Sequence, residues 1–110
     1  MENLEQICLE KLNKILSKFD LKIESIHNAL CNVWQYRLVD NSNLPETTYF
    51  DWLASWTSIS NILMHRNSIF ECLSLYSSYQ RYINAYNNIK YLENVSSLEE
   101  FLIKCDLIGV

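Results

Sequence analysis

The chain has 110 residues, 49% of them hydrophobic and 20% charged, with a formal net charge of −4. This length fits one domain with one core, and the apolar content argues against intrinsic disorder. The chain contains one Gly and one Pro, where average usage would give about seven and five. Because the only glycine is Gly109, glycine-rich phosphate-binding loops are excluded, and an all-β fold with many tight turns is disfavoured.

The first predicted helix covers residues 3–19, because its apolar residues recur at helical spacing. The residues on that side are Leu4, Cys8, Leu12, Ile15, Leu16 and Phe19. Asp20 follows as an expected N-cap, and a second helix is predicted over residues 21–38. Its apolar face would hold Ile23, Ile26, Leu30, Val33 and Trp34. The short connection at Asp20 predicts an antiparallel helical hairpin, or one helix kinked there.

The segment 39–46 is the one clear loop, since Asp, Asn and Ser cluster there and Pro45 cannot continue a helix. A third helix is predicted over 47–66 and a fourth over 69–92. Ser68 and Glu71 fit a Ser-x-x-Glu capping box between them, although one long bent helix would also explain the pattern. A second such box, Ser97 with Glu100, begins a short fifth helix over 98–107.

The fourth predicted helix carries more apolar surface than one buried face requires. Its aromatic residues include five tyrosines within sixteen residues, and Tyr is frequent at protein interfaces. Tyr76 and Tyr79 are assigned to the core. A second side is predicted to bind a partner, through Leu75, Tyr82, Tyr86 and Ile89.

The residues that could carry catalysis or bind a metal form no recognisable constellation. His27 and Cys31 are four apart and would share a helix face, but a zinc site needs two further ligands, and the chain has no C-x-x-C motif. Cysteine catalysis would need His27 or His65 beside a thiol, and no signature surrounds any cysteine. No catalytic residue, metal or cofactor is therefore predicted.

The basic residues are scattered, apart from a stripe formed by Lys11, Lys14, Lys18 and Lys22. The stripe is interpreted as a solvated face, and binding to an anionic partner is the alternative. Nucleic-acid binding is disfavoured by the net charge of −4. With no apolar run of about 20 residues and no secretory signal, we expect no membrane association and a reducing cytoplasmic or nuclear location.

These observations predict an all-α fold, in which two helical hairpins form a bundle of four main helices with a short C-terminal helix. The function predicted is that of a non-enzymatic protein–protein interaction module. Richness in Asn, Ile, Ser and Tyr is typical of AT-rich coding sequences, which favours a viral, phage or mobile-element inhibitor or regulator of a host protein. The alternatives are a homo-oligomeric subunit or adaptor of a larger assembly, a Cys/His enzyme and a nucleic-acid binder.

Overall fold

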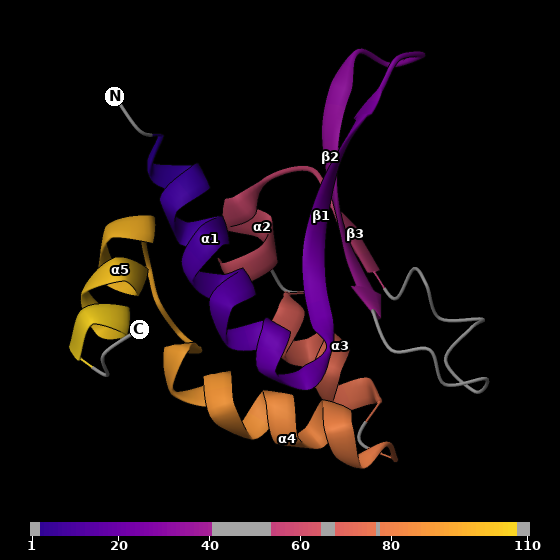
Figure 1. Cartoon of the computed structure of the whole chain (residues 1–110). Coiled ribbons are helices and arrows are strands. Elements are labelled where there is room, and N and C mark those ends of the chain that lie inside the picture. The colour runs from indigo at the N-terminus through magenta and orange to yellow at the C-terminus, as the bar shows by residue number, and fades with distance from the viewer. Residues whose placement is uncertain (1–2, 41–53, 65–67, 77, 108–110) are drawn as a thin grey trace.

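The structure combines a three-stranded antiparallel sheet, in the order β1-β2-β3, with helices that pack beside and below it (Figure 1). It is a computed structural model and describes residues 3–40, 54–64, 68–76 and 78–107. The elements in chain order are α1 (Leu4–Leu16), η1 (Ser17–Phe19), β1 (Leu21–Asn28), β2 (Val33–Asp40), β3 (Ala54–Trp56), α2 (Ile59–Met64), α3 (Ile69–Leu75), α4 (Gln80–Ile89), η3 (Lys90–Leu92) and α5 (Leu98–Leu107).

The fold is therefore α+β, and the prediction of an all-α helical bundle is wrong. The predicted second helix, 21–38, is instead a β-hairpin in which β1 pairs with β2 from Leu21↔Asp40 to Asn28↔Val33. Asn32 adopts a left-handed conformation in the connecting turn, with φ of 52°. Asparagine tolerates positive φ better than most residues, so this turn forms without glycine. The low glycine count consequently did not exclude a hairpin.

Asp20 also has a different role from the N-cap that the sequence predicts. Its φ is 59°, in the left-handed region, and it ends η1 rather than beginning a helix. Its backbone N–H donates to the carbonyl of Ser17 at 3.3 Å. The left-handed residue terminates the helical geometry, and the chain enters β1 directly after it.

Helix α1 lies within the predicted range 3–19 and is tied to the sheet by one side chain. Asn3 caps its N-terminus, because the side-chain oxygen Oδ1 of Asn3 accepts from the N–H of Glu5 at 2.8 Å. Near the other end, the Asn13 amide accepts from the N–H of Ile23 at 2.7 Å and donates to the Ile23 carbonyl at 3.1 Å. Asn13 therefore bonds to the backbone of β1 as a neighbouring strand would.

The later helices are shorter than predicted. Of the predicted helix 47–66, residues 54–56 form β3 and 59–64 form α2, while 47–53, 65 and 66 lie outside the described residues. The predicted helix 69–92 is divided into α3 and α4, and Tyr76 ends α3 by donating its N–H to Leu73. The capping interaction at α5 is present, since the N–H of Glu100 donates to the hydroxyl of Ser97 at 3.1 Å.

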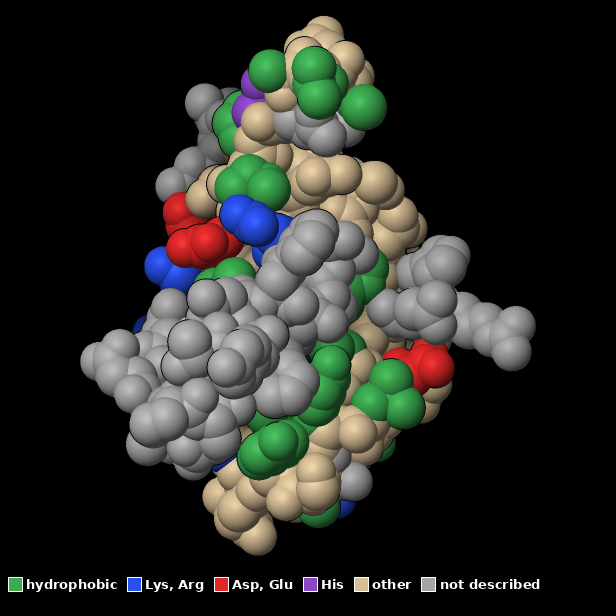
Figure 2. Space-filling view, turned by 90° about the vertical axis from the view of Figure 1, so that its right-hand side faces the viewer, with side chains coloured by type: hydrophobic (Ala, Val, Ile, Leu, Met, Phe, Trp, Pro, Cys, Tyr) green, Lys and Arg blue, Asp and Glu red, His purple; other side chains and the backbone are tan. Residues whose placement is uncertain are grey.

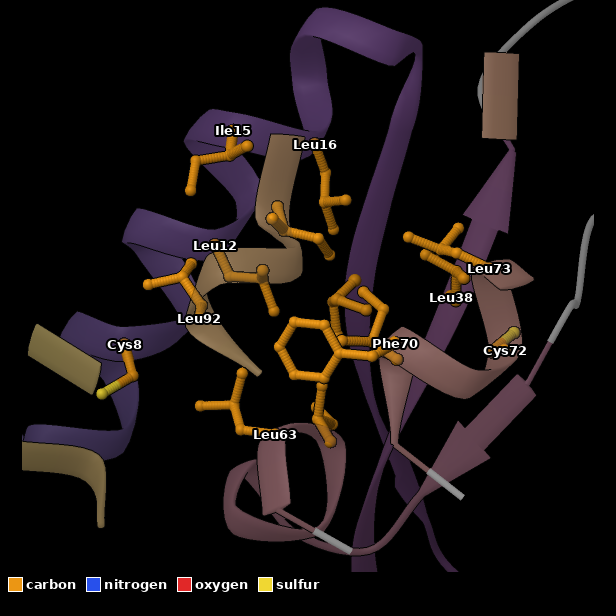
Figure 3. Packing of buried hydrophobic residues seen from close by; sticks show 14 of the residues in the cluster. Cys8, Leu12, Ile15, Leu16, Leu38, Leu63, Phe70, Cys72, Leu73 and Leu92 are labelled. Atoms are coloured by element: carbon orange, nitrogen blue, oxygen red, sulfur yellow. The ribbon is translucent and has the colours of Figure 1, made fainter. Parts of the chain in front are cut away.

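The core is one cluster of buried side chains to which every α-helix and β-strand contributes. Phe70 from α3 lies near its centre, among Leu12, Leu63 and Leu92 (Figure 3). Burying a side chain of this size stabilises the fold by about 1.5–3 kcal/mol. Within the described parts of the chain, no helix combines the length and apolarity needed to cross a bilayer.

Candidate interaction surface

The β1–β2 hairpin has one face that begins in the core and continues beyond it. Side chains alternate along a strand, so Leu21, Ile23, Ser25 and His27 share this face. Leu21 and Ile23 are buried, whereas Ser25 and His27 are exposed. The outer half of the hairpin extends past the helices, as Figure 1 shows. The face that packs against the core near the base of the hairpin is thus open to solvent at the far end.

The far end presents large apolar side chains to solvent. We call Leu30, Cys31, Trp34 and His27 the hairpin tip. Leu30 is 98% exposed and Trp34 is 58% exposed. The rings of His27 and Trp34 lie 5.2 Å apart, and His27 Nε2 is 3.1 Å from the Asn32 side-chain oxygen. Figure 2 shows hydrophobic side chains and a histidine at this end of the molecule. Trp is among the residues that most often dominate the binding energy of protein interfaces, so its exposure at the same end as Leu30 indicates a binding surface.

The base of the hairpin is fixed by a buried ion pair. Asp40, the last residue of β2, has no exposed side-chain surface, and Arg81 of α4 contacts it through two hydrogen bonds. Arg81 Nη1 lies 2.9 Å from Asp40 Oδ1, and Nη2 lies 2.5 Å from Oδ2. The same Nη1 donates to the carbonyl of Phe19 at 3.0 Å, and the Tyr82 hydroxyl donates to Asp40 Oδ2. Arg81 and Tyr82 thus join the end of β2 to α4 and η1.

The protonation states of this cluster are set by burial and by Asp40. Burial raises the pKa of Tyr82, and its hydrogen bond to Asp40 raises it further, so the phenol stays neutral. Burial lowers the pKa of Arg81, but the hydrogen bond and charge of Asp40 outweigh this and raise it overall. Arg81 therefore remains charged. The charged Arg81 and the neutral Tyr82 hydroxyl together compensate the buried Asp40 carboxylate. We call these three residues the joint, because they connect the base of the hairpin to α4.

The structure does not bring the predicted partner-binding residues together on one exposed surface. Tyr82 is 1% exposed and Ile89 is fully buried, and both belong to the core. Leu75 is exposed, and Tyr86 is partly buried. The excess of apolar residues has a structural cause, because α4 packs against α3, η1 and α1, and its exposed side carries polar residues such as Asn84 and Asn88.

Tyr86 lies beside a surface hollow of about 370 Å³, whose lining also includes Glu71 and Glu93. The Tyr86 hydroxyl donates to Glu93 at 3.4 Å, and the charge of Glu93 raises the pKa of Tyr86. No Lys, Arg, His or Cys is present among the described residues that line this hollow. Its two carboxylates would favour a cationic group, but they do not form a nucleophile–base pair.

The four lysines of the predicted basic stripe do not lie on one helix. Lys11 and Lys14 are on α1, Lys18 is in η1 and Lys22 is in β1. Lys11 Nζ lies 3.6 Å from Asp106 of α5, and Lys22 Nζ lies 2.9 Å from Glu24. Nearby carboxylates offset part of the positive charge at two of the four positions.

Among the described residues, the ring of His27 forms a hydrogen bond to Asn32 and none to a cysteine. Cys8, Cys72 and Cys105 are buried, and Cys31 is exposed in the turn of the hairpin. Burial raises the pKa of both Cys8 and Cys72 to about 11 and also raises that of Cys105. A raised pKa leaves little thiolate at neutral pH. No cluster of metal-ligating side chains occurs among the described residues, and His65 lies outside them.

The rate of thiol labelling should distinguish the exposed Cys31 from the three buried cysteines. In the native protein at pH 7.5, we expect Cys31 to react with a thiol reagent before the other three cysteines, because it is exposed. Cys8, Cys72 and Cys105 should react only after unfolding, because they are buried and two have a pKa of about 11. Absorbance-monitored labelling of the wild type and of Cys31→Ser checks this. A rapid reaction that survives in Cys31→Ser would contradict it.

The hairpin tip was missed because its residues also fit a helix. The apolar residues of this segment recur at helical spacing, namely Ile23, Ile26, Leu30, Val33 and Trp34, and this spacing predicts a helix. The signal for strands was the β-branched and aromatic content on either side of the Asn28–Asn32 segment. Comparisons of the chain with protein-family models, with curated proteins and with solved structures found no match.

Proposed function

We propose that the protein is a non-enzymatic protein–protein interaction module that docks on its partner through the hairpin tip. The observation that carries this proposal is the exposure of Leu30 (98%) and Trp34 (58%) at the end of a projecting hairpin. Burying these two side chains in a partner would remove a large apolar area from water, which is the dominant favourable contribution to most protein association.

The rigidity of the hairpin base supports this role. An arm that is already ordered loses less conformational entropy when it binds than a mobile loop does. Asp40, Arg81 and Tyr82 fix the base of β2, and Asn13 fixes the start of β1 through Ile23. The hairpin is therefore anchored at its base to α1 and α4 before any partner binds. Such a preformed Trp-bearing element suits a regulator or inhibitor that acts by covering a surface.

The other classes have weaker support in the geometry. The three buried thiols with raised pKa values do not favour a Cys/His enzyme. The carboxylates near Lys11 and Lys22 weaken the case for an anionic partner or nucleic acid. A homo-oligomeric subunit has support from the outer edge of β1, where backbone groups of Ser25 and His27 face away from β2. The viral, phage or mobile-element origin stays a prediction from composition.

The docking proposal is tested by comparing three tagged proteins in pull-downs from cells of the native host. The double variant Leu30→Ser/Trp34→Ala should lose the specific partner, because truncating a central Trp commonly costs 2 kcal/mol or more, roughly 30-fold in affinity. Leu107→Ser is the matched control, since Leu107 is also exposed, at 80%, but lies on α5. Equal capture by the double variant and the wild type would refute the proposal.

A further inference from the structure

β1 is an edge strand, and the outer part of its edge has a row of backbone groups that point away from β2. Among the described strands, the sheet order β1-β2-β3 leaves β1 with one neighbour. The N–H and carbonyl of Ile23 bond to Asn13, so they face the outer edge. In an antiparallel pair, alternate residues direct both groups to the same side. Ser25 and His27, two and four residues further on, therefore also face outward.

The edge is covered at Ile23 and open beyond it. Among the described residues, no hydrogen bond from another element reaches the backbone of Ser25 or His27. Two N–H groups and two carbonyls are consequently available in an already extended conformation. Such a row on an edge strand is a template for pairing with another strand.

We propose that β1 pairs antiparallel with β1 of a second copy of the chain, about a two-fold axis that passes through Ile26. Ser25 then lies opposite His27 of the partner subunit, and His27 lies opposite Ser25 of the partner subunit. Each pair exchanges two N–H···O=C bonds, which gives four in total. The two three-stranded sheets join into a sheet of six strands, and the interface is isologous.

The available groups select this register over its neighbours. If the register shifts by two residues in one direction, Ser25 lies opposite Ser25 of the partner subunit and His27 lies opposite Ile23 of the partner subunit. That second pair cannot bond, because the backbone N–H and carbonyl of Ile23 are already bonded to Asn13 in its own chain. A shift in the other direction pairs His27 with His27 of the partner subunit and moves Ser25 to the turn at Ala29. Each shift leaves two hydrogen bonds instead of four. Only the axis at Ile26 uses every open group on both copies.

The side chains in this register are compatible with a second copy. Ile26 lies opposite Ile26 of the partner subunit, which makes an apolar cross-strand pair. Glu24 lies opposite Asn28 of the partner subunit, so two like charges do not face each other across the axis. Glu24 is already within 2.9 Å of Lys22 in its own chain, which limits its repulsion of the second copy. This self-complementarity favours a second copy over an unrelated strand.

The inference goes beyond the proposed function, because it uses the edge of β1 and not the hairpin tip. The Leu30→Ser/Trp34→Ala variant is expected to dimerise like the wild type. Loss of partner capture and loss of the dimer can therefore be distinguished.

The first test is the mass in solution, measured by light scattering from 5 to 200 μM. We expect the wild type to approach twice its 13.0 kDa chain mass as concentration rises. Ser25→Pro should stay monomeric, because proline removes an outward N–H that β2 does not use and is tolerated on an edge strand. Ser25→Thr keeps the N–H and should still dimerise, while circular dichroism verifies that both variants fold. A wild type that is monomeric at 200 μM would overturn the inference.

The second test determines the register of the β1–β1 pairing by disulfide cross-linking, and it does not depend on a variant that destabilises the fold. In a Cys31→Ser background, Ile26→Cys should form an intermolecular disulfide on mild oxidation. The paired Cα atoms would lie about 4.5 Å apart, within the range that disulfides span. Glu24→Cys is the matched control, because in this register it is displaced from its own copy by about 13 Å along the strands. Equal cross-linking of the two variants would overturn the register.

Discussion

Replacing Asp40 with leucine should lower the free energy of unfolding by about 3–5 kcal/mol, the usual cost of removing one partner of a buried ion pair. The Asp40 side chain is fully buried and contacts Nη1 and Nη2 of Arg81 as well as the Tyr82 hydroxyl. Its loss leaves a cation and a phenol without their acceptor at the junction of β2 and α4. Urea denaturation followed by circular dichroism measures this change.

The matched control is Asp106→Ala, which removes an exposed ion pair. Asp106 is 73% exposed and lies 3.6 Å from Lys11, so its loss should change the free energy of unfolding by no more than about 1 kcal/mol. The double variant Asp40→Leu/Arg81→Leu should recover part of the loss, because it removes both buried charges. Equal effects of Asp40→Leu and Asp106→Ala would show that the joint does not stabilise the fold.

Replacing Phe70 with alanine should cost about 3–5 kcal/mol, from the lost burial of the ring together with the cavity that remains. Phe70 is 1% exposed and packs in the middle of the core cluster (Figure 3). Because α3 carries it between the sheet and α1, the surrounding side chains belong to several elements and cannot all move inward. The predicted result is a lower midpoint in urea with little change in slope.

Leu75→Ala is the control for this substitution, since Leu75 follows Phe70 on the same helix but is 75% exposed. Its effect should stay within about 0.5 kcal/mol, as for most surface substitutions. A loss at Leu75 as large as that at Phe70 would mean that Leu75 is covered in solution.

The sequence was a good guide where one amphipathic pattern and its cap agreed. The spacing of Cys8, Leu12 and Ile15 places their side chains on the buried side of α1, and all three are buried. At the other end of the chain, the Ser97 cap precedes α5 in the position that the capping box indicates. Both are local signals, in which neighbouring residues determine one turn of helix.

The hairpin could not be found by the same reasoning, because it depends on two left-handed residues and on distant contacts. Asp20 and Asn32 take left-handed conformations, although the sequence predicts helix on both sides of Asp20 and at Asn32. The joint at its base links Asp40 to Arg81, 41 residues later, and Asn13 reaches Ile23 across the end of α1. Tyr82 and Ile89 were assigned to a surface for the same reason. Besides the neighbouring α3 and η3, the elements that pack against α4 are η1 and α1, which lie far away in the sequence.

Asn13 also limits how the sheet could aggregate. An edge strand with an unbroken row of backbone groups recruits extended chains without regard to their sequence. By occupying the groups of Ile23, Asn13 leaves an open stretch centred on Ser25 and His27. That stretch is shorter than the six or seven residues that form the tightly packed strands of fibrils. The Asn13 side chain thus leaves the chain able to form a dimer through β1 but opposes the growth of a fibril along that edge.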